Sequence, residues 1–173
     1  SPTTPTWTIQ GSGAASPLVG TTVTTRGVVV GDYEGPSPTL RGFYIQDATG
    51  DGDASTSDGL FVFNGSNNSV NLGDVVVVTG AVGEFQGQTQ VSATAVNACG
   101  TGTVAPVDVT LPAPSADFLE QYEGMLVRLP QALEVTEHFQ LGRFGQVVVS
   151  SGARLRQPTD VVAPGAAAAA LQA

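Results

Sequence analysis

Residues 73–97 decide the fold, and they read Gly73-Asp-Val-Val-Val-Val-Thr-Gly-Ala-Val-Gly-Glu-Phe-Gln-Gly-Gln-Thr-Gln-Val-Ser-Ala-Thr-Ala-Val-Asn97. Two runs rich in valine and threonine flank Gln86 and Gly87, a pair typical of a tight turn between strands. Val and Thr favour strands because their branched side chains pack well on a pleated surface. We therefore expect one strand at residues 73–85 and another at residues 88–97. Gly80 and Gly83 should let the first of these strands bend.

Three similar runs lie upstream, and we expect strands at residues 21–33, 40–47 and 59–64. Gly27 and Gly31 interrupt the first run, which is typical of a long curved strand. Five curved strands within about a hundred residues match the strand number of an OB-fold barrel, the oligonucleotide/oligosaccharide-binding fold. A short strand around Trp7 and Ile9 would cover one barrel end. The fold class predicted is therefore all-β, a five-stranded OB-fold barrel, with a β-sandwich as the alternative.

The chain of 173 residues has a formal net charge of −9, from 15 acidic residues against six arginines and no lysine. A charge of this sign repels phosphate at long range. Nucleic-acid binding would therefore depend on clustered arginines, stacking aromatic rings or a bridging cation. Cys99 is the only cysteine, so it forms no disulfide within the chain, and we expect it to be a buried small hydrophobic residue. No stretch is apolar over the roughly 18 residues that a membrane-spanning helix needs.

The composition changes after Cys99 to a linker rich in Gly, Thr and Pro. We expect a short helix at residues 115–122, with Ser115 as its N-cap. Strands should follow at residues 125–129, 133–139, 146–150 and 154–157, and the alanine run at 166–170 is either helical or the start of a linker. The predicted organisation is an OB-fold barrel at residues 1–100, a linker with a short helix at 101–123, and a partial second OB-like β-unit with an Ala-rich tail at 124–173.

Several motifs carry a resemblance to a known family. They are Ile9-Gln-Gly-Ser-Gly, Ser16-Pro-Leu-Val-Gly, Gly42-Phe-Tyr-Ile-Gln-Asp, Thr49-Gly-Asp-Gly-Asp, Gly73-Asp-Val-Val-Val-Val-Thr-Gly and Tyr122-Glu-Gly-Met-Leu-Val. In this order they resemble the N-terminal YhcR-type OB-like domain of bacterial extracellular endonucleases. The resemblance implies a secreted or cell-surface protein and a non-catalytic module. It also implies an endonuclease/exonuclease/phosphatase-type catalytic domain outside this stretch, which uses Mg²⁺ or Mn²⁺.

The acidic stretch between two of the expected strands has the ligand spacing of a calcium loop. With Asp47 at position one, Gly52 stands at position six, where a glycine permits the sharp turn, and acids at alternate positions can surround one Ca²⁺ ion. The loop departs from an EF-hand at positions three and twelve and in its flanking strands, so we expect weaker affinity. The alternative is a solvated Asp/Gly loop. The metal ligands predicted are Asp47, Thr49, Asp51, Asp53 and Asp58.

The strands at residues 40–47 and 59–64 are the expected nucleic-acid face, because OB-folds bind their ligands there. Along each strand, residues alternate between two faces; one face must fill the barrel, and the other can stack on bases. The alternative is that most of these aromatic residues belong to the core. The arginines of the second half either form one phosphate-contacting patch or lie scattered. The nucleic-acid-binding residues predicted are Arg41, Tyr44, Phe61, Phe63, Arg128, Arg143 and Arg154.

The sequence contains no recognisable catalytic motif. His138 lies near Glu134 and Glu137, but a lone histidine in an alternating strand is more often solvated or packed. A nucleophile motif and a phosphate-binding glycine loop are both absent from the sequence, so we expect no catalysis by this stretch. The function predicted is a calcium-binding accessory module that helps to bind or present DNA or RNA to a downstream catalytic domain of the same chain. The alternative is a calcium-stabilised structural or adhesive β-module that contacts proteins or glycans.

Overall fold

The computed structural model describes residues 2–171, apart from the side chain of Phe144. The described chain divides into two compact units. One unit contains the residues up to Asp108 together with Ser115–Arg128, and the other contains Val109–Pro114 and the residues from Leu129 onward. The first residue and the last two residues of the predicted domain ranges lie outside the described residues.

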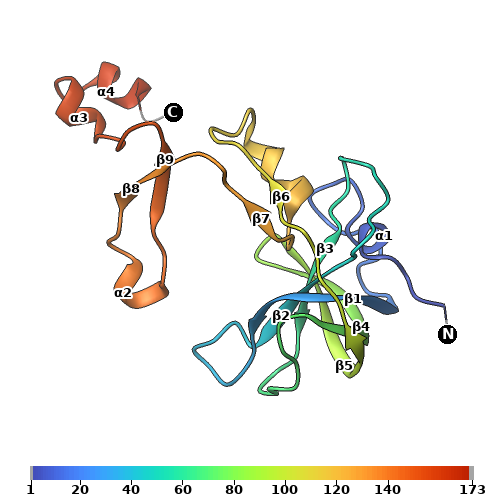
Figure 1. The fold of residues 1–173 in the computed structure, drawn as a ribbon. Coiled ribbons are helices and arrows are strands. Elements are labelled where there is room, and N and C mark those ends of the chain that lie inside the picture. The colour runs from blue at the N-terminus through green and yellow to red at the C-terminus, as the bar shows by residue number, and fades with distance from the viewer. Residues whose placement is uncertain (1, 172–173) are drawn as a thin grey trace. The chain divides into compact units, whose positions relative to one another are not determined.

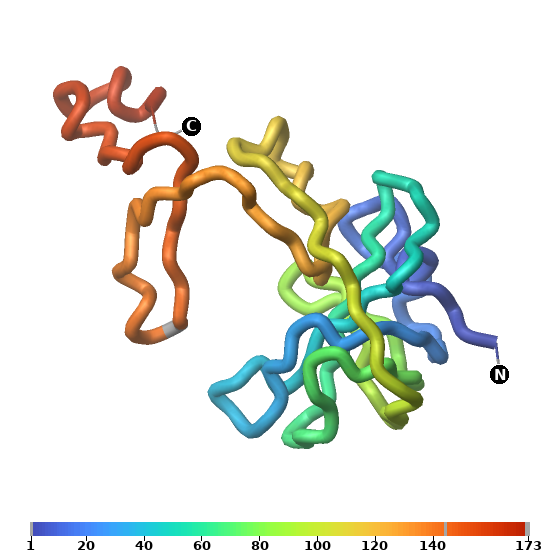
Figure 2. The backbone as a smooth tube through the Cα atoms, in the orientation of Figure 1, coloured from blue at the N-terminus to red at the C-terminus, as the bar shows by residue number. Residues whose placement is uncertain are grey.

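The first unit is built on one five-stranded sheet, shown in Figure 1, with strands β1 (Thr22–Tyr33), β2 (Gly42–Gln46), β3 (Gly59–Phe63), β4 (Asp74–Phe85) and β5 (Gln88–Thr101). The strands pair in the order β1-β2-β3-β5-β4, and β4 pairs again with β1, so the sheet closes on itself. Neighbouring strands are antiparallel except β3 and β5, which are parallel. Figure 2 follows the same path as a tube.

The mostly β architecture confirms the coarse fold prediction, and each of the five expected strands is present. The turn between β4 and β5 consists of Gln86 and Gly87, which both have positive φ, as a tight two-residue hairpin turn requires. The hairpin predicted at this position is therefore confirmed. The assignment of the closed sheet to the OB-fold stays a prediction.

The interior of the closed sheet is filled from alternate strand positions. On β2 and β3, four side chains are fully buried: Phe43, Ile45, Leu60 and Val62. Valines of β1, β4 and β5 complete the same core, together with Ile9 and Val70. Because successive side chains of a strand point to opposite faces, the intervening Tyr44 and Phe61 point outward.

α1 (Thr6–Gln10) occupies residues for which the sequence predicts a short strand, so that prediction is wrong. Its buried residues are Thr6, Ile9 and Gln10, which share one face of a helix because they are three and four positions apart. A run of this length fits both the period of a helix and the period of a strand, so its hydrophobic pattern does not distinguish a helix from a strand. The Thr6 hydroxyl donates to the carbonyl oxygen of Asp58 and the Gln10 amide to that of Gly59, both at 2.8 Å. These bonds fix α1 beside the start of β3.

η1 (Ala116–Tyr122) is a 3-10 helix that confirms the predicted short helix, although no side chain caps its start. The chain after η1 lies against the sheet, because a Cβ on Gly59 would come within 2.3 Å of the carbonyl carbon of Gly124. Nearby, the Leu126 N–H donates to Oε1 of Gln46 at 2.8 Å. β7 (Val127–Arg128) then pairs in parallel with β6 (Val107–Asp108). The structure thus groups Ser115–Arg128 with the sheet, whereas the sequence predicts boundaries at 100 and 124.

The second unit contains a hairpin of β8 (Leu133–Glu137) and β9 (Val148–Ser151), with α2 (Leu141–Phe144) between the strands. α3 (Pro158–Val161) and α4 (Ala166–Ala170) follow, so the alanine run is helical. Residues 154–157 form no strand in the described chain, and the strand predicted there is wrong. The partial second OB-like unit stays a prediction.

Two further features predicted from the sequence are Cys99 and the absence of a membrane-spanning stretch. Cys99 is exposed, so its predicted burial is wrong. It lies near the end of β5, where residues 97–101 are all exposed, beyond the part of the strand that pairs with β3. Among the residues that the structure describes, no helix has the length and apolarity needed to cross a membrane.

Candidate nucleic-acid interface and acidic loop

An aromatic cluster, defined by Tyr33, Tyr44, Phe61 and Phe63, covers the outer face of β1, β2 and β3. Tyr44 pairs with Phe61 across β2 and β3, and their ring centroids lie 4.9 Å apart. Tyr33 at the end of β1 has its ring centroid 6.0 Å from that of Tyr44, edge to face. Tyr33 is 51% exposed, whereas Phe61 is only 5% exposed. Tyr33 therefore offers the most surface for stacking, with the half-buried Tyr44 beside it, and Phe61 supports Tyr44.

Two glycines allow the rings to lie close to the backbone. A Cβ on Gly31 would come within 3.0 Å of the Tyr33 ring and 3.3 Å of the Tyr44 ring. A Cβ on Gly42 would come within 2.7 Å of the Phe61 ring. Any other residue at Gly31 would press on the rings, and one at Gly42 would first overlap the Val62 carbonyl oxygen, 2.1 Å from the new Cβ. Gly31 is therefore needed for the cluster, although in the sequence alone it indicates only a bend in β1.

Arg41 lies at the Phe63 end of the cluster, with its guanidinium carbon 5.2 Å from the centroid of the Phe63 ring. This is a cation–π distance. Regular strand alternation would place Arg41 on the inner face with Phe43, but its φ of 62° is left-handed and interrupts the alternation. Nε of Arg41 is buried without a hydrogen-bond partner, and the side chain forms no ion pair with any described residue. Its charge therefore remains available beside the aromatic rings.

The other predicted arginines differ in their surroundings. Arg128 forms a two-pronged ion pair with Asp108, with nitrogen–oxygen distances of 2.6 and 2.8 Å. This hydrogen bonding lowers the pKa of Asp108 and raises the pKa of Arg128. Arg143 on α2 and Arg154 after β9 belong to the second unit. The charge of Arg128 is compensated within the chain, whereas Arg41 lies directly beside the aromatic cluster.

The acidic loop joins β2 to β3 and is organised by its own carboxylates. Oδ1 of Asp47 accepts the N–H groups of Thr49 and Gly50 at 2.8 and 3.1 Å. Oδ1 of Asp53 accepts the N–H and the hydroxyl of Ser55, both at 2.8 Å, and these bonds lower the pKa of Asp53. Such side-chain-to-backbone turns are typical of Asp-rich loops. In Asp47 and Asp53 they use one oxygen and leave the other without a donor in the described chain, whereas both oxygens of Asp51 lie within hydrogen-bond distance of the Thr56 hydroxyl.

Asp58 is the acid of this loop whose charge is least compensated. Its Oδ1 is buried without a hydrogen-bond partner. Burial raises the pKa of Asp58, and the charges of Asp51 and Asp47 raise it further, against a smaller opposite effect of the Asp51 backbone N–H. Its carboxylate lies over Gly50, where a Cβ would come within 2.5 Å of Oδ2. Three predicted ligands, Asp47, Asp51 and Asp58, thus lie within electrostatic reach of one another.

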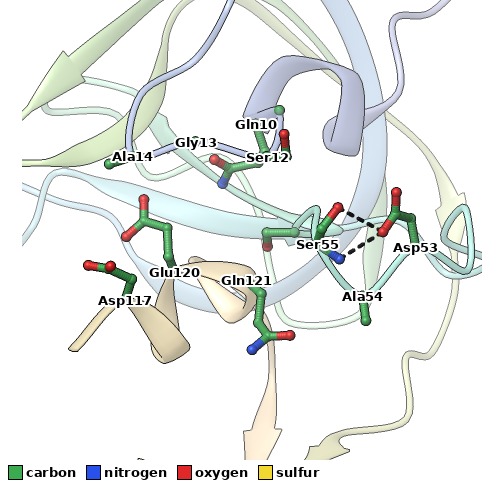
Figure 3. A pocket seen from close by; sticks show the side chains of 12 residues that line it. Gln10, Ser12, Gly13, Ala14, Asp53, Ala54, Ser55, Asp117, Glu120 and Gln121 are labelled. Atoms are coloured by element: carbon green, nitrogen blue, oxygen red, sulfur yellow. Dashed lines mark hydrogen bonds between the residues drawn. The ribbon is translucent and has the colours of Figure 1, made fainter. Parts of the chain in front are cut away.

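Asp53 faces a different part of the surface. It lines a pocket of about 800 Å³ together with residues of η1 and of the loop after α1. In Figure 3, Asp117 and Glu120 lie on the η1 side of this pocket, and Asp53 lies on the opposite side, hydrogen-bonded to Ser55. Within residues 2–171, no group of three or more His, Cys, Asp or Glu side chains is arranged to hold a metal ion. Asp53 thus lines a pocket shared with η1, whereas Asp47, Asp51 and Asp58 lie near one another.

A groove beside the aromatic cluster is the feature that sequence reasoning missed. It has a volume of about 350 Å³ and is lined by Tyr33, Tyr44, Gln88 and residues 124–127, together with Val30 and Gly31 of β1. Nε2 of Gln88 donates to the Tyr44 hydroxyl at 3.1 Å. Tyr33 could have been found as an aromatic residue at a strand end. Gln88 and residues 124–127 carry no sequence signal, because they meet the cluster only through the closed sheet.

Glu123 anchors the chain that forms one wall of this groove. Its Oε1 accepts the Thr89 N–H at 2.9 Å and the Gln10 amide at 3.2 Å. Burial raises the pKa of Glu123, against these hydrogen bonds, and the charges of Glu120 and Glu84 raise it further. Residues 124–127 are thus held to α1 and to the start of β5 as well as to β2.

Comparison with protein-family models gives no match, and comparison with curated proteins gives none either.

Proposed function

We propose that this chain is a non-catalytic OB-fold accessory module of a secreted bacterial nuclease. In this proposal it binds DNA or RNA and presents it to a catalytic domain outside this stretch. The single observation that carries the proposal is the aromatic cluster on the outer face of β1, β2 and β3, in which Tyr33 is exposed and Tyr44 half-buried. The closed order of the five strands supports the OB-fold assignment.

Stacking on aromatic rings suits a chain with a net charge of −9, because the attraction acts on the faces of the bases. Bases within a duplex are already stacked and paired, so the bound form is single-stranded. Arg41 supplies a local positive charge for one backbone phosphate. We expect weak binding that depends on salt only slightly, since few phosphates are neutralised.

The test is fluorescence anisotropy with short labelled single-stranded and duplex oligonucleotides at low salt. Tyr44→Ala should weaken single-strand binding by roughly 5- to 150-fold, the loss of one stacked base. Phe139→Ala is the matched control, because Phe139 is 83% exposed but belongs to the second unit. Equal affinity of Tyr44→Ala and Phe139→Ala would contradict the proposal. Cleavage of the oligonucleotides by the purified chain would contradict its non-catalytic role.

Calcium is the second part of the proposal, with Asp47, Asp51 and Asp58 as the central ligands and with Thr49 and Asp53 at the loop positions between them. The residues fit a hard cation, because Oδ1 of Asp58 is buried and lacks a donor beside two further carboxylates. Bound calcium would compensate the repulsion among these carboxylates.

Calorimetric titration of calcium into chelator-treated protein tests this part. Wild type should release or absorb heat and gain melting temperature at millimolar calcium, and Asp58→Asn should abolish both effects. Asp160→Asn is the control, because Asp160 is an exposed acid of α3 outside the loop. Absence of any calcium effect in the wild type would remove the metal from the proposal. If calcium stabilises the chain but oligonucleotides do not bind, the alternative function, a calcium-stabilised structural or adhesive β-module, takes its place.

A further inference from the structure

We propose that the groove beside the aromatic cluster holds one unpaired nucleobase, with residues 124–127 as the wall that encloses it. The inference rests on the proposed nucleic-acid function and adds a base site that the pattern of β2 and β3 does not contain. The groove volume of about 350 Å³ lies at the lower end of the range of small-molecule pockets, which is about 300–1,000 Å³.

The lining of the groove suits a base better than a phosphate. Among the described residues that line it, none is acidic or basic. A phosphate placed there would lose water without gaining a compensating cation, which is costly. Arg41 precedes Gly42, which pairs with both Tyr33 and Phe63, and its guanidinium lies over the Phe63 ring and not in the lining of the groove. The uncharged base and the charged backbone of one nucleic-acid strand therefore contact different parts of the outer face of the sheet.

The polar groups of the groove can recognise the edge of a base. The Tyr44 hydroxyl accepts a hydrogen bond from Nε2 of Gln88, so its own proton remains free to donate. The same bond leaves Oε1 of Gln88 free to accept. A base presents donors and acceptors side by side on its edge. Tyr33, which is 51% exposed, supplies the ring on which the base stacks.

The wall is formed before any ligand binds. The Leu126 N–H donates to Gln46 at 2.8 Å, and the Leu126 carbonyl oxygen accepts from the Val107 N–H at 3.0 Å. The Met125 N–H donates to the Tyr122 carbonyl oxygen at 3.0 Å. A fixed wall lowers the entropy cost of binding. It also favours a single strand, because a base must leave its stack before it can enter a groove closed on one side.

The experiment compares three probes by fluorescence anisotropy: a short single-stranded oligonucleotide, the same sugar–phosphate chain without bases, and the neutral oligosaccharide cellohexaose. Tyr33→Ala should weaken binding of the oligonucleotide by roughly 5- to 150-fold. Gln88→Leu should weaken it by roughly 5-fold or more, through loss of one polar contact. Both variants should bind the abasic chain as wild type does. Phe139→Ala should leave all three affinities unchanged.

The outcomes separate this inference from the proposed function. If Tyr44→Ala and Arg41→Ala weaken oligonucleotide binding while Tyr33→Ala and Gln88→Leu do not, the base site is refuted and the nucleic-acid function stands. If the wild type binds no oligonucleotide, both are refuted. Binding of cellohexaose that Gln88→Leu abolishes, without oligonucleotide binding, would assign the groove to a neutral glycan and overturn the inference.

Discussion

Adding a single methyl group at Gly59 should loosen the wall of the groove from the sheet. In the Gly59→Ala variant the new Cβ would lie 2.3 Å from the carbonyl carbon of Gly124, and 2.5 Å from both its oxygen and the Met125 nitrogen. All three atoms belong to the backbone, so no side-chain rotation can relieve the overlap. Either the sheet or residues 123–128 must move.

The cost can be estimated from the contacts involved. Inserting a methyl group into a packed site costs about 1–3 kcal/mol, and backbone neighbours place this case at the upper end. Loss of the hydrogen bond between Leu126 and Gln46 adds about 1 kcal/mol. Alanine regains about 0.5–1 kcal/mol, because glycine is unfavourable inside a strand. The free energy of unfolding should therefore fall by about 3 kcal/mol.

Gly83→Ala is the matched control, because Gly83 also lies inside a strand and a Cβ there would meet no atom within 4 Å. This variant should be about 0.5–1 kcal/mol more stable than wild type. The assay is urea unfolding followed by the fluorescence of Trp7, the only tryptophan, which lies on α1 in the first unit. Hydrogen exchange of the Leu126 amide should be faster in Gly59→Ala than in wild type.

Two results together would refute this reasoning. One is an unfolding free energy of Gly59→Ala within about 0.5 kcal/mol of that of Gly83→Ala. The other is an unchanged exchange rate of the Leu126 amide. The close approach of Gly59 and Gly124 would then not hold the wall, and the groove would not be a preformed site.

Three further predictions concern single side chains. Burial raises the pKa of Glu34, but hydrogen bonds from the loop after β3 outweigh this effect and lower the pKa. Glu34→Gln should therefore reduce the free energy of unfolding in urea at neutral pH by about 2–3 kcal/mol. The control Glu137→Gln, on the exposed face of β8, should reduce it by less than about 0.5 kcal/mol. The Glu34 contribution should disappear as the pH falls through the lowered pKa, and equal urea midpoints of the two variants at neutral pH would contradict it. Folding raises the pKa of Asp58, so the folded state takes up a proton more readily than the unfolded chain, and the calcium-free protein should gain stability as the pH falls from neutral. Asp58→Asn should be more stable than wild type in chelator at neutral pH, and it should lack this part of the pH dependence in urea unfolding. A variant less stable than wild type would show that the charge of Asp58 is compensated in the folded protein. Cys99 is exposed, so a thiol reagent should label the native protein at a rate close to that of the denatured protein, and labelling that requires denaturant would show that the end of β5 is covered.

Local patterns were sufficient to predict the five strands of the closed sheet. Valine-rich runs, glycine at bends and the Gln86-Gly87 turn are determined by neighbouring residues, and the structure has all five strands. α1 was not predictable in this way, because five residues around Ile9 fit both the helical and the strand period. Alternation also predicted that Phe43 and Ile45 share one face of β2, and both are fully buried.

The candidate sites depend more strongly on contacts distant in sequence. The sequence could name Tyr44 and Phe61, but their relation to Tyr33 follows from the pairing of β1 with β2. Similarly, the acidic loop shows even spacing in sequence, yet the fold turns Asp53 toward a separate pocket and leaves Asp58 partly buried near other loop acids. Spacing along a chain does not specify the direction of side chains in an irregular loop.

The sequence by itself determined the β-rich architecture, the positions of most strands and the chemical types of the candidate ligands, because these depend on residues within one strand or one turn. The tertiary structure decided which rings are exposed, that Arg128 pairs with Asp108 while Arg41 lies beside the Phe63 ring, and that residues 124–127 form a wall beside Tyr44 and Gln88. These features arise from closure of the sheet and from the contact of Gly59 with Gly124, which join residues far apart in the chain.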